Sequence, residues 1–346
     1  MNTRRLTRDS FSPATVAGCV LTRDLRDAAG RLVLSKGTVL DDASASRLPD
    51  LAWDELHVVT LDVGDVHERD AGMRLAEVAA GPGVALGASG GGHWPLESMH
   101  RGILDVRRSA LDAVNEVEGL CVYTLYDAQV VDRGEVVARA KIVPFVLDEA
   151  LVARGEGLAR SSDGLVAVRP FLPVRVGAVV QESLGSRAMS RFEAALGEKV
   201  EWFGSSFMPP VFAAPTADAV AAGLRDLLGA GARVIALAGS KPMDPLDAAF
   251  DALERIGARM VRHGVPAHPG SLFWLARAGE VPIVGMPSCG LFSQASVFDL
   301  VLPRLLTGER LEAHDLASLG HGGFLTRDMA FRFPPYRQAR ERGAVE

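Results

Sequence analysis

The chain has 346 residues, which is enough for about two domains of ordinary size. Hydrophobic residues make up 48% and charged residues 23% of it, so a wholly disordered or collagen-like chain is excluded. The formal net charge of −6 argues against nucleic-acid binding through bulk basicity. Arginine supplies 33 of the 37 basic residues, a bias that codon usage in a GC-rich genome explains. The four lysines are Lys36, Lys141, Lys199 and Lys241.

Cysteines and apolar runs indicate the compartment. The three cysteines, at positions 19, 121 and 289, are too few and too scattered for a disulfide framework. No apolar run approaches 18 residues, and the N-terminal segment lacks the apolar core of a signal peptide. We therefore expect a soluble, cytoplasmic protein that binds neither membranes nor nucleic acid.

The first half of the chain predicts a β-rich region over residues 1–65 and an α+β region over 66–170. Short apolar runs bounded by glycine or proline predict strands at Arg31–Leu34, Thr38–Leu40 and Leu56–Leu61. Apolar periodicity then predicts helices at Val66–Ala80 and Arg108–Val117, and strands at Cys121–Leu125 and Val136–Phe145.

Two segments of this half are predicted to be irregular. Gly81–Gly92 is glycine-rich and predicted to be a loop; the adjoining Gly90–Trp94 fits a flexible surface loop better than a lid over a ligand. The polar tract Leu147–Gly164 is predicted to be a boundary or an elaborate connection.

The second half predicts an α/β domain over residues 171–310, followed by a tail over 311–346. Predicted strands are Arg175–Val180, Lys199–Phe203, Val234–Ala238, Arg259–His263 and Val281–Gly285. Predicted helices between and after them are Arg187–Leu196, Thr216–Leu228, Pro245–Ile256 and Phe292–Leu306. Such alternation is typical of a mostly parallel sheet covered on both faces. Ligands of these sheets bind beyond the carboxyl ends of the strands, so the loops after Val180, Ala238 and Gly285 are the places to search.

The loop after Ala238 carries the strongest signal. Gly239 allows close approach of the backbone to a ligand, Ser240 offers a hydroxyl and Lys241 offers a cation. The following helix directs its positive N-terminal end at the same space, which suits a phosphate. A structural alternative competes, because Asp244 suits the N-cap of that helix and Asp247 its third position.

The other strand-end loops give weaker signals. Ser183 adds a hydroxyl after the first strand, and His268–Ser271 is a tight turn. Cys289, near the start of the last helix, is either a nucleophile with a lowered pKa or, more commonly for its type, a small buried residue.

These loops, in this order, resemble the molybdopterin-binding domain of molybdenum-cofactor biosynthesis proteins. That family includes molybdopterin adenylyltransferases and molybdate insertases. The resemblance covers about Arg175–Gly308, and its most specific part is Gly264–Leu306, where a Pro-Gly turn, a strand-end proline loop and the following helix come in family order. It implies a three-layer C-terminal domain of the molybdopterin-binding type, bacterial in style and homo-oligomeric.

By position, the resemblance implies that molybdopterin or the molybdenum cofactor binds at the strand-end loops. Together with Lys241, chosen for its charge, the implied residues are Ser183, Gly239, Ser240, Asp244, Asp247, Pro269, Gly270, Pro287 and Ser288. Any Mg²⁺ would come with the ligand phosphate and Asp247.

Two departures from the family pattern bear on activity. Enzymatic members usually begin the second loop with Thr-Gly-Gly, where this chain has Ala238-Gly239-Ser240, and they have Pro-Gly where this chain has Pro287-Ser288. Three functions therefore stay open: nucleotidyl transfer to, or molybdate insertion into, molybdopterin; a non-catalytic carrier or regulator of the cofactor, which hands it to other biosynthesis proteins or molybdoenzymes; and hydrolysis of nucleotide pyrophosphates on the same fold.

Overall fold

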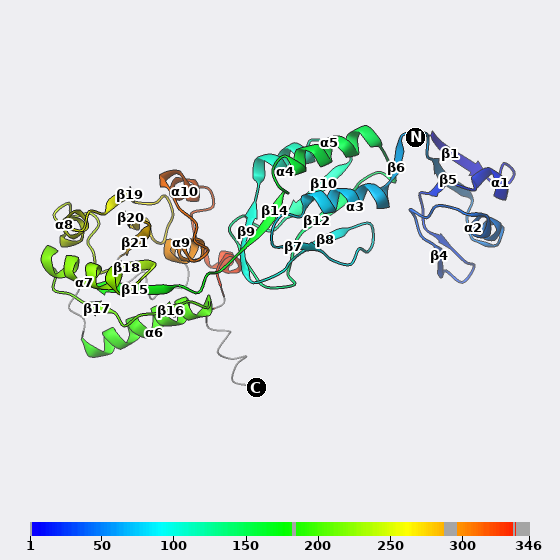
Figure 1. Ribbon diagram of the computed structural model, residues 1–346. Helices are drawn as coiled ribbons and strands as arrows, with labels where there is room; N and C mark the ends of the chain where they lie inside the picture. The colour runs from blue at the N-terminus through cyan, green and yellow to red at the C-terminus, as the bar shows by residue number, and fades with distance from the viewer. Residues whose placement is uncertain (1, 182–184, 287–295, 335, 337–346) are drawn as a thin grey trace. The chain divides into compact units, whose positions relative to one another are not determined.

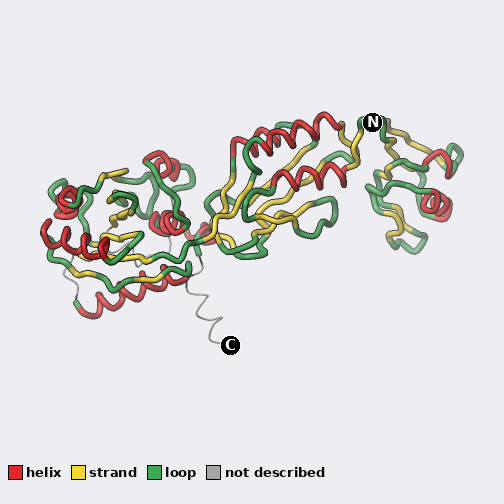
Figure 2. The backbone as a smooth tube through the Cα atoms, viewed as in Figure 1, coloured by secondary structure: helices red, strands yellow, loops and turns green. Residues whose placement is uncertain are grey.

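The computed structural model describes residues 2–181, 185–286, 296–334 and 336. Its contacts divide the chain into two compact units, both of which mix helices and strands (Figures 1 and 2). The first unit takes residues 1–100, 104–127 and 131–168, and the second takes 101–103, 128–130 and 169–346. In the described residues, no helix is long and apolar enough to cross a membrane. The finer four-part division made from the sequence stays a prediction.

The first unit begins with a small lobe that has its own core. Its sheet has the order β1-β5-β2, with β1 at Asn2–Thr7, β2 at Val20–Leu21 and β5 at Glu55–Thr60. The short strands β3 and β4 pair at Leu25–Arg26 and Leu32–Leu34, and two helices lie at Pro13–Val16 (α1) and Asp42–Arg47 (α2). Buried leucines, Val58 and Trp53 fill the space between them.

A larger α+β part completes the first unit. Its helices are α3 (Glu68–Ala79), α4 (Arg108–Asn115) and α5 (Glu149–Arg160). Its strands are β6 (Asp65–His67), β7 (Val84–Leu86), β8 (Trp94–Ser98), β9 (Gly102–Val106), β10 (Leu120–Thr124), β11 (Val130–Val131), β12 (Val136–Ile142), β13 (Val146–Asp148) and β14 (Val166–Pro170). They form sheets of order β10-β12-β8-β7 and β11-β9-β14, and β6 pairs with β13.

The helices and longer strands predicted in this half are confirmed, but three predictions are wrong. Thr38–Leu40 makes only an isolated bridge, at Val39. Gly81–Gly92 contains β7, and Leu147–Gly164 contains the whole of α5. The helix was overlooked because the side of α5 that packs inward consists largely of small residues.

The second unit is built on a seven-stranded sheet. Its order is β16-β15-β18-β21-β20-β19, with β17 also paired to β15. The strands are β15 (Arg175–Val180), β16 (Ser206–Phe207), β17 (Val211–Phe212), β18 (Val234–Ala238), β19 (Arg259–His263), β20 (Trp274–Ala278) and β21 (Val281–Met286). β20 runs antiparallel to both neighbours, whereas β15, β18 and β21 are parallel. The central strands are apolar throughout because both of their faces are buried.

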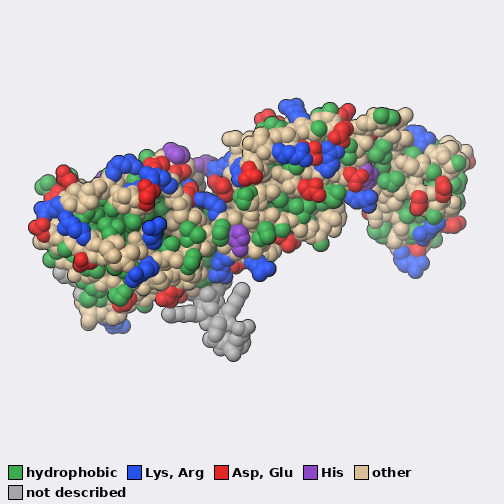
Figure 3. All heavy atoms as spheres, in the orientation of Figure 1, with side chains coloured by type: hydrophobic (Ala, Val, Ile, Leu, Met, Phe, Trp, Pro, Cys, Tyr) green, Lys and Arg blue, Asp and Glu red, His purple; other side chains and the backbone are tan. Residues whose placement is uncertain are grey.

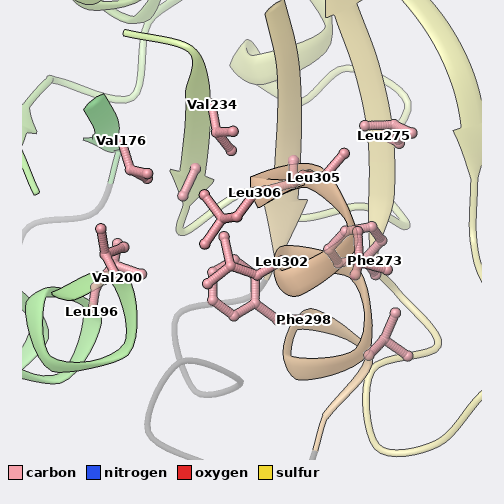
Figure 4. Packing of buried hydrophobic residues seen from close by; sticks show 14 of the residues in the cluster. Val176, Leu196, Val200, Val234, Phe273, Leu275, Phe298, Leu302, Leu305 and Leu306 are labelled. Atoms are coloured by element: carbon pink, nitrogen blue, oxygen red, sulfur yellow. The ribbon is translucent and has the colours of Figure 1, made fainter. Parts of the chain in front are cut away.

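Helices cover both faces of this sheet. On one face, α6 (Ser186–Trp202) and α9 (Val297–Leu306) pack on alternate strand residues such as Val176 and Val234 (Figure 4). On the other face, α7 (Ala217–Gly229) and α8 (Ala248–Arg255) pack on Val179 and Ile235. A short helix, α10 (Ala313–Ala317), follows in the tail.

Two predictions fail in the second unit. The predicted strand Lys199–Phe203 is instead the end of α6, whose buried Leu196 and Val200 continue one helical stripe. β20 was not predicted, although Gly270 before it and Gly279 after it mark the ends of a short apolar run.

Candidate functional site

The carboxyl ends of three adjacent parallel strands lie level at one edge of the sheet. Val180 at the end of β15 is in register with Ala238 at the end of β18, and Ala238 is in register with Met286 of β21. The ends of these strands therefore lie next to one another, at the edge where ligands of parallel sheets bind. Ser183 lies outside the described residues, and so do Pro287, Ser288 and Cys289.

A buried hydrogen-bond network joins the first two loops. Gln181 follows β15 and is 4% exposed; Asp247 is 7% exposed. The Gln181 amide nitrogen Nε2 donates to both carboxylate oxygens of Asp247, at 2.8 and 3.1 Å. Asp247 also accepts from the backbone N–H groups of Lys241, at 2.9 Å, and Ala249, at 3.0 Å. One carboxylate thus fixes the bend of the second loop and the side chain of the first.

The other end of the Gln181 amide has no partner among the described residues. The carboxylate of Asp247 needs donors, so it holds the Nε2 side of the amide and leaves the oxygen Oε1 facing away. That oxygen is buried and accepts no hydrogen bond in the described structure. An unsatisfied buried acceptor is rare in native proteins and costs free energy, so this atom marks a place where a ligand donor would fit.

The start of α8 corrects two predictions about the acids. The helix begins at Ala248 rather than Pro245, and its N-cap is Asp247 rather than Asp244. Asp244 is exposed, and its side chain accepts from the Leu246 N–H at 3.0 Å. The displacement occurs because Asp247 gains two buried donors, Gln181 Nε2 and the Lys241 N–H, that Asp244 would not reach.

In the second loop, Gly239 and Ser240 hold the backbone in place, and Lys241 is an exposed cation. Gly239 has φ +81°, a conformation that favours glycine. Ser240 is 4% exposed, and its hydroxyl accepts from Trp274 Nε1 at 3.3 Å, which anchors the loop to β20. Lys241 is exposed, and its side chain makes no ion pair within the described part of the chain.

The Pro269–Gly270 turn is packed against the beginning of α9. The Val297 N–H donates to the Pro269 carbonyl at 3.1 Å. A Cβ at Gly270 would lie 2.8 Å from the Cβ of Val297, so a glycine is sterically required. The turn thus sets where α9 starts and the loop before it ends.

A buried ion pair supports the same helix. Lys199 Nζ of α6 lies 2.6 Å from Asp299 Oδ1 of α9, and Ser296 donates through N–H and hydroxyl to Asp299 Oδ2. Burial raises the pKa of Asp299, while the Lys199 ammonium and the Ser296 donors act in the opposite direction. Burial and the neighbouring Asp299 raise the pKa of Tyr336 well above its usual value.

Sequence reasoning missed Gln181 and the Lys199–Asp299 pair. Gln181 could have been found, since it is the first polar residue after a strand that is buried on both faces. Lys199 carried no such signal, because its partner is 100 residues away.

A magnesium site at Asp247 gains no support. Both oxygens of its carboxylate already accept N–H groups, and in the described part of the chain no three His, Cys, Asp or Glu side chains gather as metal ligands.

Comparison with solved structures finds two of related description. A molybdopterin biosynthesis moea protein from Pyrococcus horikosii is 13% identical, with 70% of this chain and 79% of that chain covered and a TM-score of 0.30. A molybdenum cofactor biosynthesis protein from Corynebacterium diphtheriae is 15% identical, with 38% of this chain and 93% of that chain covered and a TM-score of 0.24. TM-scores this low establish nothing about function. Neither a family model nor a curated relative matches the sequence.

Proposed function

We propose that the second unit binds molybdopterin or the molybdenum cofactor at the carboxyl ends of β15, β18 and β21, and that the protein acts in synthesis, modification or delivery of that cofactor. The observation that carries the proposal is the buried oxygen Oε1 of Gln181 at this edge, which accepts no hydrogen bond from the residues that the structure describes. A second support is the order of the strand-end loops, by which the sequence resembles the molybdopterin-binding domain.

The residues present fit such a ligand. A pterin edge carries ring N–H and amino donors, which suit an acceptor that lacks a donor in the described structure. The exposed Lys241 ammonium would hold a phosphate, and Gly239 leaves the backbone open for close approach. Asp247 would act as a positioning residue, because its oxygens hold Gln181 and the loop rather than facing the ligand. The metal of the finished cofactor would supply redox chemistry to a recipient enzyme.

Among the possible roles, one observation favours a non-catalytic carrier or regulator of the cofactor. Nucleotidyl transfer requires carboxylates that are free to ligate the metal ion, which in turn binds the phosphates. The best-placed carboxylate, that of Asp247, is instead engaged by Gln181, Lys241 N–H and Ala249 N–H. We therefore place binding and delivery ahead of adenylyl transfer, molybdate insertion and pyrophosphate hydrolysis.

Incubation of the full chain with molybdopterin, ATP and Mg²⁺, followed by mass spectrometry, tests the proposal. Bound and unchanged pterin supports the carrier, and a nucleotidylated pterin supports the transferase. ATP hydrolysis without pterin binding would overturn the proposal in favour of the hydrolase.

Two variants test the site itself. Gln181→Met keeps the side-chain volume but removes the acceptor Oε1 together with the Nε2 donor to Asp247, and Lys241→Gln removes the cation; each should weaken pterin binding by about 1–3 kcal/mol. Arg47→Gln, which removes one positive charge from α2 of the first unit, is the matched control and should bind normally. Unchanged binding by both site variants would show that the ligand lies elsewhere.

A further inference from the structure

The first unit holds a cavity of about 560 Å³ that the function proposed above does not use. Three segments line it: residues 36–39 of the N-terminal lobe, residues 67–69 at the start of α3, and residues 89–94, which lead into β8. Its volume lies within the range of about 300–1,000 Å³ typical of small-molecule sites.

Positive charge is concentrated at this cavity. Lys36 and Arg69 line it. Lys141 of β12 lies beside it, since a Cβ added at Gly92 would be 3.9 Å from Lys141 Nζ and 3.7 Å from Glu68 Oε2. Two of the four lysines in the chain therefore meet here, and Glu68 is the one acid among the lining residues.

Arg69 Nε lies 3.9 Å from Asp70 Oδ1, but the other charges at the cavity have no such partner in the described residues. Neither Lys36 nor Lys141 lies within 4.0 Å of a carboxylate in the described residues, and the Glu68 carboxylate has no salt bridge or hydrogen bond there. Arg74 of the same α3 helix shows the contrast, because its guanidinium pairs with both Glu149 and Glu156. The described ion pairs of the fold therefore include neither lysine, and the single lining carboxylate, Glu68, does not balance the cations around it.

Backbone contacts fix the lining in place. His67 Nε2 bonds to the Gly37 carbonyl at 2.9 Å, and its Nδ1 accepts from the Arg69 N–H at 3.1 Å. Gly37 has φ +82°, a conformation that favours glycine, and the Glu68 carboxylate lies next to it. Gly91 and Gly92 form the tight turn between Gly90 and His93, both with positive φ.

We propose that this cavity binds a small phosphorylated molecule that also carries hydroxyl or amino donors. Lys36, Arg69 and Lys141 would hold the phosphate through charge-assisted hydrogen bonds, which are the stronger kind. Glu68, an acceptor only when ionised, would take the hydroxyl or amino group. Gly90–Trp94, predicted from the sequence to be a surface loop rather than a lid, becomes one wall of the site.

Binding of AMP and of inorganic pyrophosphate to the full chain, measured by isothermal titration calorimetry, tests this site. Lys36→Gln and Lys141→Gln should each weaken the binding of both compounds by about tenfold or more, and added salt should weaken it further. Glu68→Gln should weaken AMP binding but strengthen that of pyrophosphate, from which it removes a repelling charge. Arg47→Gln is the control, and it should bind AMP as the unchanged protein does.

Two results would overturn the proposal. One is that neither compound binds at millimolar concentration; the other is that binding survives both lysine substitutions. Loss of AMP binding in Lys241→Gln would assign the phosphate to the strand-end site instead. Because pterin binding is measured with variants of the second unit, failure of that function and failure of this site are separable.

Discussion

Asp247 shows how one residue can serve both the fold and a site. It caps α8, ties Lys241 into the loop and turns the Gln181 oxygen outward. The two sequence-based interpretations, helix cap and binding residue, therefore do not compete. The cap is what holds Gln181 in a position to bind.

Asp247→Asn tests this dual role. The substitution puts an amide NH₂ where the carboxylate accepts from three N–H groups, so at least one buried donor loses its partner. We expect a loss of about 1–3 kcal/mol in the free energy of unfolding, together with weaker pterin binding. Asp244→Asn is the matched control: Asp244 is exposed, so the change should stay within about 0.5 kcal/mol. Chemical denaturation of both variants measures the difference, and equal stability would contradict the role of Asp247.

The sequence alone could identify the loops of the candidate site but not the division of labour inside them. Gly239, Ser240 and Lys241 are recognisable from their place after an apolar strand. The Ser240 hydroxyl binds Trp274, and the Gln181 amide binds Asp247, through partners 34 and 66 residues away in the sequence. No local pattern encodes such pairings.

Helix α5 illustrates, at the scale of an element, how neighbouring glycines differ. Gly155 faces the core, where an added Cβ would lie 2.2 Å from Cδ1 of the buried Leu120. Gly157, two positions on, has no atom within 4 Å of such a Cβ. The first glycine is thus a packing requirement and the second is a weak point in the helix.

Alanine substitutions separate the two. Gly155→Ala should destabilise the first unit by about 1–3 kcal/mol through overpacking. Gly157→Ala should stabilise it by about 0.5–1 kcal/mol, because alanine loses less backbone entropy in a helix. Thermal unfolding of the two variants gives the comparison. If both change stability in the same direction, the packing of α5 against Leu120 is not as described.

Arg74 holds α3 against α5 and makes that contact sensitive to acid. Its guanidinium hydrogen-bonds Glu149 and Glu156, and these bonds hold the pKa of each carboxyl below the ordinary value of 4.5. A lowered folded-state pKa means that the stabilisation is present above the unfolded-state pKa and is lost as the pH falls through the folded-state value.

Arg74→Met should therefore cost most at neutral pH and least in acid. At about pH 7 we expect a loss on the order of 1 kcal/mol, the upper end for partly exposed pairs. The difference between the variant and the unchanged protein should shrink as the pH falls below about 4.5. Calorimetric unfolding at several pH values measures it. A difference that stays constant or grows on acidification would contradict the ion-pair account.

Helices and strands are predicted correctly where their buried residues are apolar and regularly spaced in the sequence, and incorrectly where they are not. β15, β18 and β19 have the predicted bounds, because apolar or alternating runs end at clear breakers. α5 was overlooked because Gly155 and Ala159 supply the buried side with little hydrophobicity. α8 starts later than predicted because a tertiary contact, Gln181 to Asp247, selects the cap.

Across the whole molecule, charges of both signs are interspersed on the face shown in Figure 3, in keeping with a modest net charge of −6. The four lysines lie in three different surroundings. Lys199 is buried against Asp299, Lys241 is exposed at the strand-end site, and Lys36 and Lys141 lie at the first-unit cavity. Codon usage explains their number but says nothing of where they lie.

Separate cores in the two units imply separate responses to core substitutions. Lys199→Met leaves Asp299 charged and without its ammonium in the second unit, which should cost about 3–5 kcal/mol. In scanning calorimetry we expect the transition of the second unit to shift downward while that of the first unit stays in place. Arg74→Met should shift only the transition of the first unit. If either variant shifts both transitions equally, the units unfold as one.

The two units are interleaved in the sequence, which limits where the gene could be cut or recombined. Residues 101–103 and 128–130 belong to the second unit although the first unit surrounds them in sequence. Arg101 lies 4.4 Å over the ring of Trp202 and donates to its carbonyl at 3.3 Å. A fragment that starts at Arg169 would lack Arg101 and its contacts with the ring and carbonyl of Trp202. Residues 1–168 hold the whole of the first unit together with two short segments of the second, whereas a stretch that begins at Arg169 lacks part of the second unit.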